Sequence, residues 1–181
     1  MEDQKSQFLN PNVILNQLDI QQGMQIGDLG CGAGYISLAL AKEVGEKGKV
    51  YAVDIQKNVL DQVKKEAQAQ NIDNLVTIWS DLEIIGAAKI KNDILDKVFL
   101  ANVLFQVEDK RAVFAEAKRM LKQDGNLILV DWKQGDMAIG PSTGKRLDLA
   151  NIKQLAQENG LIVEKDIDAG KYHFGIVFKP V

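Results

Sequence analysis

The stretch DLGCGAGY, residues 28–35, follows an apolar run at 24–29 and precedes a largely apolar run of helical period at 36–44. Glycines directly after a strand let the backbone turn sharply and approach a ligand closely. A second apolar run, VYAVDI at 50–55, ends next to Asp54. A strand, a glycine-rich turn, a helix and a second strand predict the opening of a parallel α/β sheet.

The same alternation continues along the chain. Helical periodicity is expected over 59–72, 113–121 and 148–159, and strands over 76–79, 95–100, 127–130, 161–167 and 173–179. Asp124-Gly125 is expected to turn the chain into the strand at 127–130. Only residues 168–172 separate the last two strands, too few for a crossover helix, so these strands should pair antiparallel. The predicted fold class is α/β, a doubly wound sheet of the Rossmann-like kind with an antiparallel C-terminal hairpin.

Composition narrows the class of protein. The chain has 181 residues, 46% of them hydrophobic and 26% charged, which is typical of one globular domain over 1–181. The single cysteine excludes an internal disulfide. With only one cysteine and one histidine, a metal site is not expected. The net charge of −3 and the mixed lysine and glutamate faces argue against nucleic-acid binding. No stretch is apolar for long enough to insert into a membrane, and the acidic N-terminus lacks a secretory signal, so a cytoplasmic protein is expected.

In an open parallel sheet the ligand lies beyond the carboxyl ends of the strands. A dinucleotide fingerprint, G-x-G-x-x-G, would need glycine at position 35, where this chain has Tyr35. Asp28, just before the glycines, would oppose a pyrophosphate. A ligand with a positive end and no phosphate suits this loop, and S-adenosylmethionine, with its ammonium and sulfonium groups, is such a ligand.

Two further acidic residues end predicted strands. Asp54 is placed to accept hydrogen bonds from both ribose hydroxyls of an adenosine. Asp81 is placed to accept one from an adenine amino group. The alternative for Asp81 is the N-cap of a helix in the segment after Leu82.

The successive motifs DLGCGAGY, VYAVDI, WSDLE and DKVFLANVLFQVEDKRAVFAEAKRMLKQDGNLILVDWK together resemble the class I S-adenosylmethionine-dependent methyltransferases, type 11 group, akin to the quinone-biosynthesis methyltransferases. The resemblance covers about residues 8 to 179 and implies a seven-stranded sheet. It implies cofactor contacts from the glycine loop, ribose contacts at Asp54, adenine contacts at Asp81 and Leu82, and a cofactor-facing Asn102. The complete predicted cofactor site is Asp28, Leu29, Gly30, Cys31, Gly32, Gly34, Asp54, Ile55, Ser80, Asp81, Leu82, Asn102 and Val103.

One position departs from the group. Many relatives carry histidine shortly after the asparagine, where this chain has Phe105-Gln106, so a histidine base is not expected there. The catalytic residues therefore stay unassigned, with Asp131, Lys133, Arg146 and His173 as candidates on the substrate side, around a loop at 133–146. Lys133 and Arg146 could receive an anionic substrate. Arg146 could instead pair with Asp148 or cap a helix, and His173 could be a hydrogen-bonded structural residue.

The expected activity is transfer of a methyl group from S-adenosylmethionine to a small molecule, leaving S-adenosylhomocysteine. The alternatives are an RNA or protein methyltransferase, a non-catalytic cofactor-binding protein and an NAD(P)-dependent reductase. Residues 1–20 are expected to form a helical cap that covers the sheet edge or closes over the cofactor. Either a monomer or a homodimer is compatible with the sequence.

Overall fold

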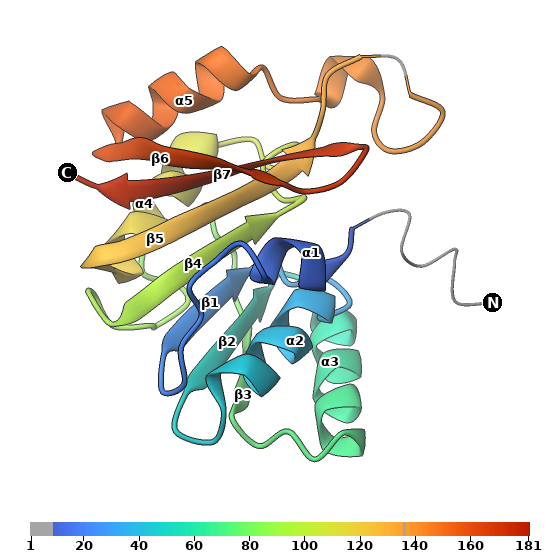
Figure 1. Cartoon of the computed structure of the whole chain (residues 1–181), viewed down its shortest axis with the longest axis vertical. Coiled ribbons are helices and arrows are strands. Elements are labelled where there is room, and N and C mark those ends of the chain that lie inside the picture. Colours follow the sequence, from blue (N-terminus) through green and yellow to red (C-terminus); the bar gives the residue numbers. More distant parts are fainter. Residues whose placement is uncertain (1–8, 136) are drawn as a thin grey trace.

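The computed structural model of the chain describes residues 9–135 and 137–181. These residues form a seven-stranded sheet with strand order β3-β2-β1-β4-β5-β7-β6 (Figure 1). The strands are β1 (Gln25–Leu29), β2 (Lys49–Asp54), β3 (Leu75–Trp79), β4 (Leu95–Ala101), β5 (Leu121–Trp132), β6 (Leu161–Asp168) and β7 (His173–Pro180). The helices are α1 (Pro11–Leu15), α2 (Tyr35–Val44), α3 (Lys57–Ala69), α4 (Lys110–Met120) and α5 (Leu149–Glu158), with a 3-10 turn, η2 (Thr143–Lys145).

The predicted fold class is confirmed. Strands β1 to β5 run parallel, whereas β7 pairs antiparallel with both β5 and β6. The short connection at 169–172 permits only this hairpin, because a parallel return would need a crossover of a dozen or more residues.

Helices cover both faces of the sheet (Figure 1). The alternation of side chains along β4 and β5 divides the core in two. Leu100 and Leu129 pack with α4 and α5 on one face, whereas Phe99 and Ile128 pack with α1 and α2 on the other. Strands buried on both faces read as continuous apolar runs, which is why they could be located in the sequence.

Strand β5 differs from the prediction. It begins at Leu121 and continues through the expected turn at Asp124-Gly125. The pairing with β4 shifts there, from Leu95 opposite Leu121 to Lys97 opposite Asn126, so the extra residues form an irregularity within the strand. A Cβ on Gly125 would lie 2.8 Å from the Asp96 carbonyl oxygen, so glycine marks this close approach of two backbones.

Only part of the predicted N-terminal cap, from residue 9 onward, is described by the structure. Residues 1–8 of the predicted 1–20 segment lie outside the described residues, and α1 is a single short helix. Ile14 and Leu15 are buried against α2, and the Gln17 side chain donates to the Asp168 carbonyl oxygen at 2.8 Å. This part of the chain therefore packs beside α2 and against the turn between β6 and β7.

The strand order reverses between β1 and β4. Their connections leave on opposite faces of the sheet, so a crevice is expected beyond the carboxyl ends of these two strands. The site described next lies there.

Candidate functional site

A cavity of about 1130 Å³ opens beyond the carboxyl ends of β1, β2, β3 and β4. Its wall comes from four loops that follow these strands and from the start of α1. The lining residues are Leu9, Asn10, Pro11, Asp28, Gly30, Cys31, Gly32, Ala33, Tyr35, Ile36, Asp54, Ile55, Gln56, Ser80, Asp81, Leu82, Glu83, Ala101, Asn102, Val103, Gln106 and Val107.

The glycine loop is packed tightly at its first glycine, Gly30. The backbone N–H groups of Gly30 and Cys31 both donate to the Val53 carbonyl oxygen, at 2.7 and 2.9 Å, which ties the loop to the end of β2. Gly30 has φ +77°, and a Cβ there would lie 2.4 Å from Val103 Cγ2. Both the left-handed backbone and the close approach of the loop after β4 require glycine.

Asp28 carries a nearly fully buried carboxylate beside this loop, 1% exposed. Its Oδ2 accepts a 2.5 Å hydrogen bond from the Ser37 hydroxyl at the start of α2. Burial raises the pKa of Asp28 to about 6, the Ser37 hydroxyl opposes the rise, and the nearby Asp54 adds to it. A buried carboxylate of this kind becomes a strong site for a cation that enters the cavity.

Asp54 closes the other side of the loop from the end of β2. One carboxylate oxygen accepts from Gly32 N at 3.0 Å and the other from Gln56 N at 2.9 Å. Each ionised oxygen has a second lone pair, so both can still accept from a pair of hydroxyl groups. The two backbone bonds hold the carboxylate in place before any ligand arrives.

Asp81 lies two residues after the end of β3, at the start of the loop that leads to β4. Its Oδ1 accepts from Glu83 N at 2.9 Å, so it caps a turn, and the connection to β4 contains no helix in the described residues. The alternative of a helix N-cap is therefore wrong. Glu83 accepts in turn from the backbone N–H groups of Glu108 and Asp109, both at 2.7 Å, and so joins this loop to the start of α4.

Asn102 lies where the cavity meets β4. It has φ +58°, which is uncommon for a residue other than glycine and typical of functional positions. Its backbone N–H donates to the Val130 carbonyl oxygen at 2.8 Å, and its own carbonyl accepts from the Gln106 side chain at 2.6 Å. Its Oδ1 is buried without a hydrogen-bond partner among the described residues. That oxygen is a free acceptor beside the cavity.

The charge of the cavity is one-sided. Asp28, Asp54, Asp81 and Glu83 line it, and none of its described lining residues is Lys, Arg or His. Such a wall attracts cations and repels phosphates. Over residues 9–135 and 137–181, no three His, Cys, Asp or Glu side chains are grouped so as to hold a metal ion.

The structure brings most of the predicted cofactor residues to this cavity. The exceptions are Leu29 and Gly34. Leu29 is fully buried in the core, and Gly34 caps α2 with φ +77°, where a Cβ would lie 2.7 Å from Val63 Cγ2. The sequence argument missed Gln56, Glu83 and Gln106 at the ends of the same loops. Their positions shortly after β2, β3 and β4 are the sequence feature that could have predicted them as lining residues.

Arg146 has a different environment from the one expected. It is buried, and its guanidinium donates to the carbonyl oxygens of Pro141 (3.0 Å), Ile139 (3.0 Å), Lys133 (3.4 Å) and Gly135. These carbonyls take the place of the expected substrate anion or Asp148. Arg146 therefore holds the 133–146 loop in its fold.

Lys133 is engaged similarly, because its Nζ donates to the carbonyl oxygens of Gly170 and Lys171, at 3.0 and 3.3 Å. Asp131 and His173 are both buried. Asp131 Oδ1 accepts from Trp132 N at 2.8 Å, and burial raises the pKa of Asp131 to about 6. Neither Lys133 nor Asp131 lines the cavity.

His173 packs its ring against Trp132, with 4.3 Å between ring centroids. Neither ring nitrogen has a hydrogen-bond partner in the described residues, so the expected hydrogen-bonded role is wrong. Burial lowers the pKa of His173 to about 4, with Lys133 adding to the shift, so the ring is neutral at pH 7. None of the four substrate-side candidates lines the cavity.

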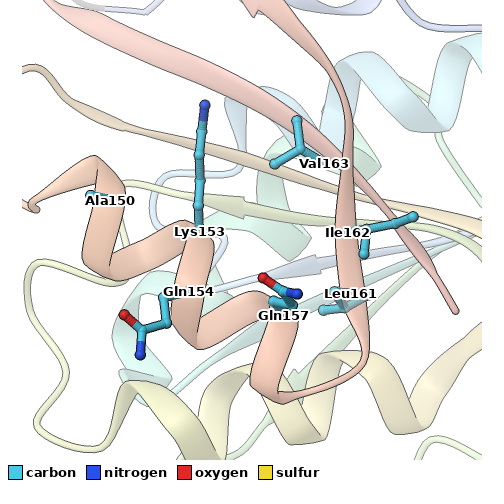
Figure 2. Close-up of a pocket in the computed structure, with 7 residues that line it drawn as sticks. All are labelled: Ala150, Lys153, Gln154, Gln157, Leu161, Ile162 and Val163. Atoms are coloured by element: carbon cyan, nitrogen blue, oxygen red, sulfur yellow. The ribbon is translucent and has the colours of Figure 1, made fainter.

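A second, smaller hollow of about 510 Å³ lies between α5 and β6 (Figure 2). Its wall includes Lys153, which pairs with Asp166 at 3.7 Å, and the exposed Gln154 and Gln157. A long ion pair and exposed glutamine side chains are common anywhere on a protein surface, so they do not indicate a ligand site. It lacks the buried carboxylates of the first cavity.

A doubly wound sheet with a glycine loop and carboxylates at its switch-point cavity, and no Lys, Arg or His among the described lining residues, is the arrangement expected of the class of S-adenosylmethionine-dependent methyltransferases. The chain belongs to the methyltransferase domain family, whose sequence model matches residues 20–175. The predicted membership is confirmed, and S-adenosylmethionine is the cofactor of this family.

Similar proteins agree with this assignment. An S-adenosylmethionine-dependent methyltransferase from Aquifex aeolicus superposes with a TM-score of 0.90 at 26% identity, covering 99% of this chain and 94% of that one. Human arsenite methyltransferase is 36% identical over 110 residues, 58% of this chain and 29% of that protein. Demethylmenaquinone methyltransferase of Lactobacillus johnsonii is 24% identical over 196 residues, 88% of this chain and 78% of that protein.

The chain spans only 34%, 29% and 45% of the length of the first three curated relatives. The match to those proteins therefore covers less than half of each. Among the described residues, no helix combines the length and the apolar character needed to cross a membrane.

Proposed function

We propose that this chain transfers the methyl group of S-adenosylmethionine to a small-molecule acceptor and releases S-adenosylhomocysteine. The observation that carries the proposal is the acidic cavity at the switch point of the sheet, with four carboxylates and no described lining cation. S-adenosylmethionine carries an ammonium and a sulfonium and no phosphate. The same charges disfavour the pyrophosphate of a nicotinamide cofactor, and with it the reductase alternative.

The proposed contacts follow the four loops. Asp28 receives the ammonium group, and the glycine loop lets the methionine part pass close to the backbone. Asp54 accepts from the ribose hydroxyls, and Asp81 accepts from the adenine amino group beside Leu82. Cys31, Ile55, Ser80 and Val103 complete the wall.

The reaction needs little chemistry from the protein. A lone pair on the acceptor forms a bond to the methyl carbon as the carbon–sulfur bond breaks, and its electrons return to sulfur, which becomes a neutral thioether. The chain has to align the two groups and exclude water. In the proposed arrangement Asn102 faces the cofactor, and Gln106, whose side chain donates to the Asn102 carbonyl oxygen, lies beside it.

The size of the cavity supports a small acceptor. Sites for one drug-sized ligand have volumes of roughly 300–1000 Å³, and this cavity, at about 1130 Å³, has room for the cofactor and a second small molecule. Two of the similar proteins are named for arsenite and demethylmenaquinone, which are both small molecules. An RNA or protein acceptor, the oligomeric state, a closing N-terminal segment, a cytoplasmic location and the type 11 grouping stay predictions.

The test of the proposed ribose contact is Asp54→Ala. Loss of this carboxylate leaves the ribose hydroxyls unpaired, which should weaken S-adenosylmethionine binding by about 1–3 kcal/mol, or roughly 5- to 150-fold. Isothermal titration calorimetry measures the change. Asp61→Ala, on the exposed side of α3, is the matched control and should bind as the unmodified protein does. Unchanged affinity in Asp54→Ala would remove Asp54 from the proposed site.

A further inference from the structure

The segment that carries the proposed adenine contacts has no regular structure of its own. Between β3 and β4 the described chain forms only turns, over residues 80–94. Lys89 and Asp93 have φ +54° and +56°, a left-handed backbone that costs free energy in residues other than glycine. A segment of this kind keeps one conformation only if contacts from outside hold it.

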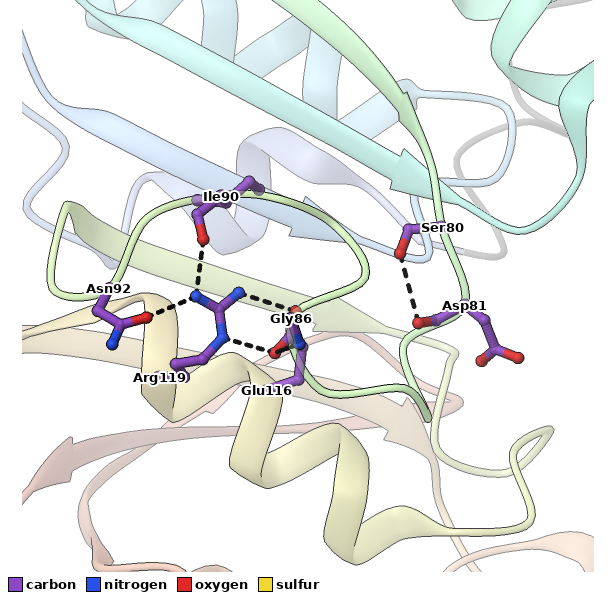
Figure 3. A network of polar contacts seen from close by, with 7 residues as sticks. All are labelled: Ser80, Asp81, Gly86, Ile90, Asn92, Glu116 and Arg119. Atoms are coloured by element: carbon purple, nitrogen blue, oxygen red, sulfur yellow. Dashed lines mark hydrogen bonds and ion pairs between the residues drawn. The ribbon is translucent and has the colours of Figure 1, made fainter.

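Those contacts come from one face of α4. Glu116, 1% exposed, accepts from Gly86 N at 2.8 Å. Arg119 donates to both oxygens of Glu116, at 2.7 and 2.9 Å. Figure 3 shows the two side chains reaching from the helix to this loop.

The Nη1 group of Arg119 binds a later part of the same loop, residues 90–92. Arg119 Nη1 donates to the Ile90 carbonyl oxygen and to Asn92 Oδ1, both at 2.7 Å. A planar guanidinium presents five donors in a fixed geometry, so it can bind the Glu116 carboxylate and two parts of the loop at the same time. Arg119 and Glu116 thus connect Gly86, Ile90 and Asn92 into one rigid unit (Figure 3).

The first residues of the same loop, 80–83, line the cavity. Asp81 is hydrogen-bonded to Glu83 N, and Glu83 is tied to the start of α4. The loop is therefore anchored to α4 near both ends, by Glu83 at its start and by the Glu116–Arg119 pair farther on. The backbone N–H groups of Asp93 and Ile94 donate to the carbonyl oxygens of Arg119 and Met120, at 3.1 and 3.0 Å, and hold the far end of the loop. Freeing the Glu116–Arg119 anchor would therefore loosen the stretch between Glu83 and Asp93, which continues directly from Asp81.

We infer that Glu116 and Arg119 are positioning residues for adenine recognition: they touch no cofactor but fix the loop that presents Asp81 and Leu82. The inference rests on the proposed function, because it takes the adenine of S-adenosylmethionine as the group that Asp81 receives. It adds a determinant of base specificity on α4, outside the cavity lining.

The experiment compares two ligands that differ at the adenine amino group. S-adenosylhomocysteine has this amino group, and S-inosylhomocysteine has a carbonyl oxygen in its place, which would face the Asp81 carboxylate. The unmodified protein should bind the first at least about 10-fold more tightly, because the second replaces the hydrogen bond to Asp81 by two acceptor oxygens that face each other. Calorimetric titration gives both dissociation constants.

Arg119→Gln should weaken S-adenosylhomocysteine binding about 5- to 20-fold and S-inosylhomocysteine binding by less than about threefold, since only the first depends on a positioned Asp81. Glu116→Gln keeps an acceptor for Gly86 N and should lower the discrimination by a smaller factor. Arg111→Gln is the control: Arg111 is also on α4 but forms an exposed pair with Glu158 of α5, and its loss should change neither constant.

An equal loss for both ligands in the folded variants, or no loss for either, would overturn the positioning role. If Arg119→Gln does not fold, Glu116→Gln decides between the same outcomes. Equal binding of both ligands by the unmodified protein would overturn the Asp81 contact and this inference together. Failure of the unmodified protein to bind S-adenosylhomocysteine at all would instead contradict the proposed function.

Discussion

Asp28→Asn is expected to weaken S-adenosylmethionine binding about 10- to 150-fold at pH 7, because a charge-assisted hydrogen bond contributes roughly 1.5–3 kcal/mol. The same change should make the protein more stable. Asparagine has nearly the same shape, can still accept from the Ser37 hydroxyl, and carries no buried charge. Calorimetry measures the affinity, and chemical denaturation at pH 7 measures the free energy of unfolding, which should rise by about 1–3 kcal/mol.

The pH dependences of stability and of cofactor affinity test the role of Asp28 independently, because they should run in opposite directions. Burial raises the pKa of Asp28 to about 6 in the folded protein, so the ionised carboxylate destabilises the fold above pH 6, and that cost disappears as the pH falls from about 6 towards 4. Cofactor binding goes the other way, because the ammonium group needs the ionised form. Affinity should be level between pH 6.5 and 7 and fall by about 10-fold at pH 5.

Two variants separate Asp28 from other titrating groups. In Asp28→Asn the affinity should no longer change between pH 5 and 7. Ser37→Ala removes the hydroxyl that opposes the pKa rise of Asp28, so the midpoint of the profile should move to higher pH. A profile in Asp28→Asn that matches that of the unmodified protein would assign the proton to another group and contradict the proposed ammonium contact.

Gly30→Ala is expected to cost about 1–3 kcal/mol of stability and, by displacing the loop, about 10- to 100-fold in S-adenosylmethionine affinity. The new Cβ would lie 2.4 Å from Val103 Cγ2, on a backbone with φ +77°. Two costs combine at this position, the steric overlap and the left-handed backbone. Thermal denaturation and calorimetry measure the two effects.

The two costs can be separated. Gly23→Ala has the strained φ of +88° with nothing within 4 Å of its Cβ, so it should lower stability by only about 1 kcal/mol and leave binding unchanged. Adding Val103→Ala to Gly30→Ala removes the overlapping methyl groups and should restore part of the affinity. If the double variant binds no better than the single one, close packing of the loop against Val103 is not what requires glycine at position 30.

Much of the fold follows from patterns within short stretches. Strands buried on both faces read as apolar runs, and the short connection at 169–172 allowed only an antiparallel hairpin. The start of β5 was missed, because the Asp124-Gly125 pair is an equally good signal for a turn and for a strand irregularity. Only the opposing Asp96 carbonyl distinguishes them, and it lies far away in the sequence.

The cavity lined by the proposed cofactor residues could be located for the same reason, since the loops after successive parallel strands meet at one edge of the sheet. The substrate side could not. Arg146 looked available for an anion, but the carbonyl oxygens that surround it come from turns of its own loop, whose geometry has no sequence signal. The contacts of Glu116 and Arg119 with the loop have no sequence signal, because Gly86 and Ile90 contribute backbone groups and not side chains.

The central claim is that the acidic cavity binds S-adenosylmethionine. The most direct measurement is a calorimetric titration of the protein with S-adenosylmethionine, S-adenosylhomocysteine and NADH in parallel. We predict micromolar binding of the first two and no binding of NADH, whose pyrophosphate meets only carboxylates among the described charged residues of the cavity. Binding of NADH without binding of S-adenosylmethionine or S-adenosylhomocysteine would contradict the account.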